Sequence, residues 1–343
     1  MNEAAYDRAV TYLAKLYSLS LYEQQGRRHP VVVYPPDPNQ MDDVDSVLGR
    51  LHAEAAPLAI YDYGHLHNLQ NSGRTLYNGD TYALHSLETH PLRVHGQPGR
   101  YFDMLATCGA LDRELALAAA SKLIRLPLRH QLHRTLPVAQ AGWRGVGRSA
   151  ALGGACLIVF NRRGQYHALL AQRSTRHALD VNQFHVMPAF VFQPVHGQWE
   201  AEWRFSDHVL REYAEELYGA AEDASSAEHP ARLHLEAMLQ VGAARLLLTG
   251  VAYNLLTLRA EICVLLLIHD PGWWEASTSA DSPLAFNAHS EAQDGRLTIV
   301  PIDTDEQIIK GLPQPLYLAM PPQAYAALWL GVTCARQRLG MHS

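Results

Sequence analysis

The most informative part of this sequence is Leu210-Arg211-Glu212-Tyr213-Ala214-Glu215-Glu216-Leu217-Tyr218-Gly219. Its glutamates occupy positions i, i+3 and i+4, a spacing that places side chains on one face of an α-helix. Like charges so placed repel one another by roughly 0.2–0.5 kcal/mol per exposed pair. Mg²⁺ or Mn²⁺ would neutralise this face, because hard divalent cations prefer carboxylate oxygens. The alternative is a solvated, glutamate-rich helix surface.

Length and composition set broad limits. A chain of 343 residues is long for one ordinary domain, so two domains are expected. A net charge of -6 argues against non-specific nucleic-acid binding, which normally needs a basic face. The four cysteines lie far apart without a C-x-x-C pair, which argues against zinc and a disulfide framework. No apolar run approaches the ~20 residues of a membrane span, so a cytoplasmic protein without membrane contacts is expected.

The second half of the sequence is typical of strands that surround a few helices. Hydrophobic runs between turn residues predict strands at 155–160, 166–172, 184–187, 246–254, 261–268 and 297–302. The glutamate-bearing helix is expected at 206–218 with Ser206 or Asp207 as its cap. Further helices are expected at 231–239 and 324–339, the last of them opened by Pro321-Pro322.

The first half is less regular. Helical spacing predicts helices at 4–24, 44–51 and 101–123, the last interrupted at Gly109, and short hydrophobic runs predict strands at 30–34 and 57–61. Asn78-Gly79 is typical of a hairpin turn. The stretch from 127 to 147 mixes Pro, His, Arg and Gly without periodicity. The expected organisation is therefore a small α/β domain at 1–135, of unknown role, and a second domain at 150–343.

The Arg-Glu-x-x-Glu-Glu core at 211–216 resembles the helical part of the Nudix box. This box is the metal-binding signature of hydrolases that cleave nucleoside diphosphates linked to another group. The stretch from His185 to Pro194, with the sequence HVMPAFVFQP, is similar to that of a bacterial Nudix subgroup with a long N-terminal extension. The resemblance covers roughly residues 150–340, and its specific part is short. It implies an α/β fold, a Nudix-like α/β/α sandwich with a mixed sheet.

The chain departs from the family pattern in the loop before the helix. Pro188-Ala189-Phe190 stands where the family has Pro-Gly-Gly, so the backbone loses two residues that reach positive φ and close approach easily. The loop is also longer than in the family. The upstream glutamate of the family pattern falls at Trp203, although Glu200 and Glu202 lie close by.

The resemblance implies roles for particular carboxylates. Glu212, Glu215 and Glu216 would hold Mg²⁺ or Mn²⁺, with Glu216 also taking part in catalysis. Glu261, at the head of a hydrophobic strand, is the leading candidate for a further ligand or general base, and an ordinary charge at a strand end is the alternative. Glu200 and Glu202 are the next candidates.

Basic and aromatic residues complete the expected site. Arg211 would brace the loop through an ion pair, for which Glu202 is the available acceptor. Arg173 and Arg176 follow a core strand and could neutralise substrate phosphates, or could be solvated surface residues. Phe190, which replaces a glycine, would lie against the substrate.

Three functions remain open from the sequence. The leading one is a Mg²⁺-dependent hydrolase that cleaves a phosphoanhydride in a small nucleotide-type substrate. The second is a Nudix-derived ligand-binding or regulatory protein without turnover, which the missing glycines favour and the glutamate trio opposes. The third is cleavage of another nucleotide bond, such as a glycosidic bond, on the same scaffold. A homodimer is one of the oligomeric states left open.

Overall fold

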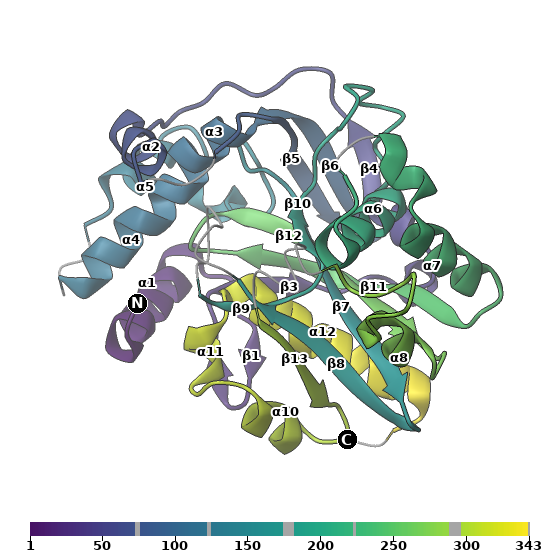
Figure 1. Ribbon diagram of the computed structural model, residues 1–343. Helices are drawn as coiled ribbons and strands as arrows, with labels where there is room; N and C mark the ends of the chain where they lie inside the picture. Colours follow the sequence, from purple (N-terminus) through teal and green to yellow (C-terminus); the bar gives the residue numbers. More distant parts are fainter. Residues whose placement is uncertain (73–75, 122–124, 174–181, 222–223, 288–295, 342–343) are drawn as a thin grey trace.

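The computed structural model is an α/β structure built around one large mixed sheet (Figure 1). It describes residues 1–341 apart from 73–75, 122–124, 174–181, 222–223 and 288–295. None of the described helices combines the length and hydropathy that a membrane-spanning segment needs.

The large sheet contains strands from both halves of the chain. Its strands are β3 (Val31–Tyr34), β7 (Gly153–Arg162), β8 (Gln165–Gln172), β9 (Phe184–Val186), β10 (Ala189–Val191), β11 (Ala244–Asn254), β12 (Arg259–Ile268) and β13 (Arg296–Pro301). The main order is β13-β8-β7-β12-β11-β3, with β9 paired to β8 and β10 paired to β7. The pair β7 and β12 is parallel and the other pairs are antiparallel, so the expected mixed sheet is confirmed.

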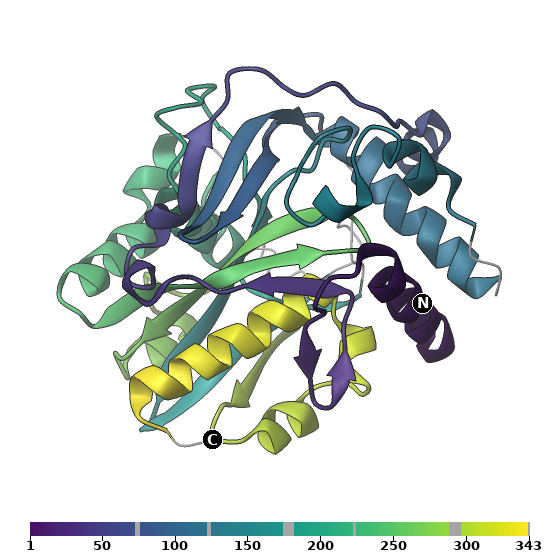
Figure 2. The ribbon, with the colours of Figure 1, turned by 180° about the vertical axis from the view of Figure 1, so that it is seen from behind.

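Helices cover both faces of this sheet. Successive side chains of a strand point to opposite faces, and on β7 the even-numbered Cys156 and Ile158 belong to one hydrophobic core while Leu157 and Val159 belong to another. The first core is closed by α6 (Phe205–Tyr218), α7 (Pro230–Gln240) and α8 (Trp273–Thr278). The second is closed by α12 (Pro322–Leu339), which lies across the sheet in Figure 2. The arrangement is therefore an α/β/α sandwich.

The N-terminal part adds a three-stranded sheet in the order β4-β6-β5 and several helices. Its elements are α1 (Glu3–Tyr17), β1 (Glu23–Gln24), β2 (Arg27–Arg28), β4 (Leu48–Leu51), α2 (Tyr63–Gln70), β5 (Asp80–Thr89), β6 (Leu92–Arg100), α3 (Tyr101–Met104), a π-helical turn at Leu105–Gly109, α4 (Ala110–Ala120) and α5 (Pro127–Leu132). The irregularity expected at Gly109 is thus a π-helical turn. Two short helices, α10 (Asp305–Gly311) and α11 (Leu316–Ala319), precede α12.

One predicted helix, at 44–51, is wrong. Residues 44–47 form a 3-10 turn, and the chain continues as β4, which pairs in parallel with β6. Gly49 lies so close to the His95 ring that a Cβ atom there would be 2.6 Å from a ring carbon. Pairing with β6 therefore outweighs the local helical spacing of the valines and leucines.

Three further expectations for the N-terminal part are wrong. The helix predicted at 4–24 ends at Tyr17, because Ser18 adopts a φ of 50°, and residues 23–24 form β1. The segment 57–61 is not a strand and forms only an isolated bridge at Leu58. The β5–β6 hairpin turns at His90-Pro91 and not at Asn78-Gly79. Asn78 has another local role, because its Oδ1 accepts a hydrogen bond from the Phe102 N–H at 2.9 Å and so holds the start of α3.

The strands and helices predicted for the second half are confirmed with small shifts of their ends. The β7–β8 turn falls at Arg163 and Gly164, with φ of 53° and 87°, as a tight hairpin of the primed type requires. The expected cap of α6 differs, because Arg204 occupies the N-cap position. The Ser206 N–H and hydroxyl instead donate to Asp45, at 2.9 and 2.6 Å. A carboxylate from the N-terminal part thus caps α6.

The expected boundary near 125–150 does not separate two sheets. β3, from the N-terminal part, is an edge strand of the large sheet and pairs with β11. One hydrophobic core also contains Leu84 and Leu111 from the first half together with Phe192 and Tyr213 from the second. A division into two independently folding domains stays a prediction, and the shared sheet and core favour one integrated unit.

The long loop before α6 binds the N-terminal sheet. The Trp203 ring stacks on Phe192, with ring centroids 5.1 Å apart, and also contacts Tyr82 of β5. Its Nε1–H donates to the Gly49 carbonyl at 2.9 Å. The ring covers Gly96 so closely that a Cβ atom there would lie 2.6 Å away. The additional loop length therefore builds an aromatic contact with the N-terminal sheet.

Trp203→Ala should lower the free energy of unfolding by about 2–3 kcal/mol, less than the ~3–5 kcal/mol for a fully buried aromatic ring, because Trp203 is only half-buried. Urea unfolding would measure the change. Trp203→Phe keeps a ring but loses the bond to Gly49, so a loss of about 1 kcal/mol is expected. Equal stability of the alanine variant and the parent would show that the loop does not hold the N-terminal sheet.

Candidate functional site

The glutamate-bearing helix forms as predicted. Phe205, Val209 and Leu217 on its apolar face are at most 1% exposed and pack in the core beneath the sheet. Tyr213 lies on the same face, and its hydroxyl accepts a hydrogen bond from the Trp273 Nε1–H at 2.8 Å. The helix ends at Gly219, whose φ of 69° is readily adopted by glycine. This burial fixes the direction of the opposite, acidic face.

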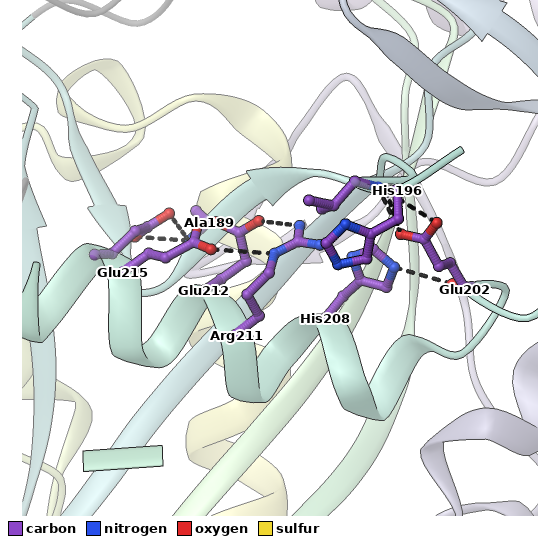
Figure 3. Close-up of polar contacts among 9 residues, drawn as sticks. Ala189, His196, Glu202, His208, Arg211, Glu212 and Glu215 are labelled. Carbon is purple, nitrogen blue, oxygen red and sulfur yellow. Dashed lines mark hydrogen bonds and ion pairs between the residues drawn. The ribbon is translucent and has the colours of Figure 1, made fainter. Parts of the chain in front are cut away.

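The three glutamates of the helix are nearly buried, and Figure 3 shows Glu212 and Glu215 beside Arg211. The Arg211 guanidinium lies beside them: its Nη2 is 2.7 Å from Glu212 Oε1 and its Nε is 3.3 Å from Glu215 Oε1. The side chains of Arg211, Glu212 and Glu215 are only 9–10% exposed. Both carboxylate oxygens of Glu216 accept from the Ala189 N–H, at 3.0 and 3.1 Å. The helix thereby binds the segment that replaces the family's Pro-Gly-Gly.

Ala189 is held from its other side as well. Arg173 Nη2 donates to the Ala189 carbonyl at 2.8 Å, so an arginine of the chain contacts the residue that Glu216 holds. The space lined by Arg173, His185, Ala189 and Glu216 measures about 10 Å³. A space of that size accommodates about one water molecule.

The space beside Glu216 does not fit a hydrated divalent cation in the observed arrangement, because Mg²⁺ needs near-octahedral oxygen coordination and usually keeps several waters. Glu215 and Arg211 line a separate, larger space of about 290 Å³. In the parts of the chain that the structure describes, no three His, Cys, Asp or Glu side chains are grouped to hold a metal ion. The expected grouping of Glu212, Glu215 and Glu216 as metal ligands thus has no support from this geometry.

Glu202 organises its own loop. Its carboxylate accepts hydrogen bonds from the backbone N–H groups of Val195, His196 and Gln198, at 2.6–3.2 Å. Burial alone would favour the protonated acid, but these hydrogen bonds together lower the pKa of Glu202. Arg211 is paired with Glu212 and Glu215, so the ion pair expected between Arg211 and Glu202 is replaced by pairs within α6.

His208 is a site residue that the sequence analysis missed. Its Nε2 lies 3.0 Å from the Glu202 carbonyl, and its ring is close to the Arg211 guanidinium (Figure 3). Burial and the charge of Arg211 lower the pKa of His208 to about 4, so the ring is neutral at pH 7. The available signal was its position three residues before Arg211, which places both side chains on one helix face.

Glu261 lies away from the α6 glutamates. On β12, Glu261 alternates with Cys263 and Leu265 on one face of the strand, and the side chains of Cys263 and Leu265 belong to the core that α12 covers. Glu261 therefore lies on the α12 face of the sheet, opposite the face that α6 covers. It is 8% exposed and lines a cavity of about 370 Å³.

Three residues, Phe190, Arg173 and Arg176, were expected to contact a substrate. Phe190 is half-buried: its ring fills the space over Gly154, where a Cβ atom would lie 2.3 Å away, and stacks on Phe205 with centroids 5.8 Å apart. Arg173 makes the internal contact with Ala189. Arg176 lies outside the described residues. The structure thus brings together Arg173, Arg211 and the α6 glutamates, and it does not bring Glu202 or Glu261 into that group.

No family model and no curated protein matches this chain. The resemblance to Nudix hydrolases therefore rests on the motif residues of 185–194 and 211–216.

Proposed function

We propose that this chain is a small-molecule-binding protein on a Nudix-like scaffold, in which the acidic face of α6 stabilises the structure and performs no hydrolysis. The observation that carries the proposal is the set of contacts around α6. Arg211 pairs with Glu212 and Glu215, and Glu216 holds the Ala189 N–H. The protein's own groups thus engage the carboxylates that the family uses for metal.

Metal-assisted hydrolysis would require these contacts to break. Glu216 would have to release the Ala189 N–H, and leaving a buried donor unpaired costs about 1–3 kcal/mol. Arg211 would also have to leave two nearly buried carboxylates, and separating such ion pairs is costly. The contacts of Arg173 and Glu216 with Ala189 act in the same direction, because they fix the backbone where the family has flexible glycines.

The scaffold offers a different place for a ligand. The cavity at Glu261 has a volume of about 370 Å³, within the ~300–1,000 Å³ of small-molecule sites. Its lining combines apolar side chains, such as Leu256 and Met320, with buried polar ones, such as Asn254 and Gln323, and small-molecule sites likewise combine both kinds. Binding without turnover therefore accounts both for this cavity and for the engaged glutamates.

Metal titration tests the proposal. Millimolar Mg²⁺ or Mn²⁺ should leave the Tm unchanged, because a ligand raises stability only where it binds the folded state. Nucleoside diphosphate derivatives incubated with the protein and either metal should not release phosphate-containing products. Calorimetric scanning and product analysis would provide the two measurements.

Glu216→Gln and the exposed Glu200→Gln form the matched pair for this experiment. A metal-dependent rise in Tm that Glu216→Gln removes and Glu200→Gln keeps would contradict the proposal. Metal-dependent turnover with the same pattern would restore the hydrolase expectation in full.

A further inference from the structure

The cavity at Glu261 lies where several distant segments meet. The head of β12 and the end of β11 form one side, α4 forms another, and the residues around the start of α12 close it. It contains polar side chains from strand and helix, and its walls include the apolar side chains of Met104, Leu256 and Met320. This combination provides both specific contacts and a surface for an apolar group.

Two opposite charges are buried side by side in this cavity. Arg259 and Glu261 are each 8% exposed and stand two residues apart on β12, so both side chains leave the same face of the sheet. Strand geometry separates their Cα atoms by about 6.6 Å. A buried cation and a buried carboxylate at this spacing offer a ligand one positive and one negative group.

The structure holds both charged residues in place. Arg259 Nε donates to the Ala151 carbonyl at 2.8 Å, which fixes the guanidinium by one edge. Glu261 lies against Gly153, where a Cβ atom would be 2.7 Å from Glu261 Cγ. A glycine at 153 thus leaves the space that the carboxylate side chain needs. Such preorganised charges are typical of recognition sites.

Other polar groups of the cavity satisfy one another. Asn254 Nδ2 donates to Gln323 Oε1 at 2.7 Å, and Asn254 Oδ1 accepts from the Leu256 N–H at 2.8 Å. At the more exposed side, Arg113 lies 3.9 Å from Asp62, which offsets its charge. Arg259 and Glu261 are the oppositely charged side chains that line the cavity at its nearly buried end.

We propose that this cavity binds a zwitterionic small molecule of the amino-acid class. The carboxylate of the ligand would pair with Arg259, whose guanidinium suits planar carboxylates, and its ammonium would pair with Glu261. The apolar side chain would lie against Leu256 and Met320. The proposal rests on the proposed binding function, because it uses Glu261 as a ligand contact and not as a general base.

Size and charge separate this ligand from a nucleotide. The volume of about 370 Å³ is near the lower end of small-molecule sites, so it suits an amino acid better than a nucleoside diphosphate carrying a further group. Phosphates would also place several negative charges next to the carboxylate of Glu261, and like charges in a low-dielectric site repel strongly.

Isothermal titration calorimetry with the common L-amino acids, taken singly, tests the proposal. An amino acid with a large apolar side chain, such as L-phenylalanine, should bind. N-acetyl-L-phenylalanine lacks the ammonium and L-phenylalanine amide lacks the carboxylate, so each should bind roughly 10- to 100-fold more weakly. Glu261→Gln should weaken L-phenylalanine by a similar factor and leave N-acetyl-L-phenylalanine unchanged.

Matched variants on α4 separate a blocked cavity from a misfolded chain. Ala116 lines the cavity, whereas Leu117 points outward and is 60% exposed. Ala116→Trp should abolish amino-acid binding and Leu117→Trp should preserve it, with unchanged circular dichroism in both. Binding that survives Ala116→Trp would overturn the proposal, as would binding of the two charge-deficient analogues as tight as that of L-phenylalanine.

Absence of binding by every common amino acid, or tighter binding of adenosine or ADP in the same titration, would also overturn it. These outcomes are distinct from failure of the proposed function. Failure of the proposed function would appear as metal-dependent turnover that Glu216→Gln removes.

Discussion

Arg211→Met is expected to lower the free energy of unfolding by about 4 kcal/mol, because removing one member of a buried ion pair leaves its partner's charge uncompensated. Arg211 is 7% exposed and contacts two carboxylates, Glu212 at 2.7 Å and Glu215 at 3.3 Å. Both would then remain nearly buried beside Glu216. Urea unfolding at neutral pH would measure the loss.

Companion variants show whether charge is the cause. Arg211→Lys should lose less, because lysine keeps the charge but cannot present two donors in a fixed fork. In the Arg211→Met background, Glu215→Gln should recover part of the stability, since it removes one of the buried charges. A double variant as unstable as the sum of the single variants would assign the effect to packing. A loss below about 1 kcal/mol for Arg211→Met would match an ordinary surface pair and contradict the structural role of α6.

Sequence patterns predicted the second half well because each element there carries a local signal. The hydrophobic runs of β7 and β12 are long, since both faces of these central strands are buried. In the N-terminal part the decisive contacts are distant. Pairing of β4 with β6 overrides the helical spacing of residues 44–51, and no local pattern announces that pairing.

In the candidate site, too, local sequence patterns predict some contacts, and contacts between distant segments are not predictable. The face of α6 was predictable from the i, i+3 and i+4 spacing, and the Arg211–Glu215 pair is itself an i, i+4 contact. The location of Glu261 could also have been inferred, because the period of two along β12 assigns it to the face of Cys263. The contacts of Arg173 and Glu216 with Ala189 join three segments separated by loops, so only the folded structure reveals them.

The longer loop before α6 has a structural explanation that the family pattern lacks. Trp203 stands where the family has a glutamate, and it binds the N-terminal sheet through its ring and its Nε1–H. Glu202 next to it closes the loop through backbone N–H groups. Trp203 thus connects the two halves of the chain at the position where the Nudix pattern has a glutamate. This agrees with a scaffold adapted to binding.

Stability should fall steeply between about pH 6.5 and pH 4, with His29 and His208 each contributing about 3 kcal/mol to the loss. Burial lowers the pKa of both side chains to about 4 from an ordinary value of 6.5, and the charge of Arg211 adds to the effect at His208. A histidine with a lower pKa in the folded state takes up a proton on unfolding. Stability therefore rises with pH across this range and is lost as the pH falls through it.

The surroundings of each ring explain why the proton is unfavourable. His29 is 1% exposed and its Nδ1 lies 2.9 Å from the Tyr6 hydroxyl, amid several tyrosine rings. His208 is 2% exposed, and its Nδ1 has no hydrogen-bond partner among the described residues. Protonation of His208 would therefore bury a new N–H without an acceptor, close to the positive charge of Arg211.

Urea unfolding at a series of pH values tests this account. His208→Gln keeps a side-chain N–H donor for the Glu202 carbonyl but cannot titrate, so it should remove about half of the predicted slope between pH 4 and 6.5. His29→Gln should act likewise. The two effects should add, because the two rings have different hydrogen-bond partners and do not contact each other. His130→Gln, at an exposed position, should leave the slope unchanged. A parent protein whose stability is flat over this range would show that neither buried histidine resists protonation, and a slope unaffected by both core variants would assign the acid sensitivity to carboxylates instead.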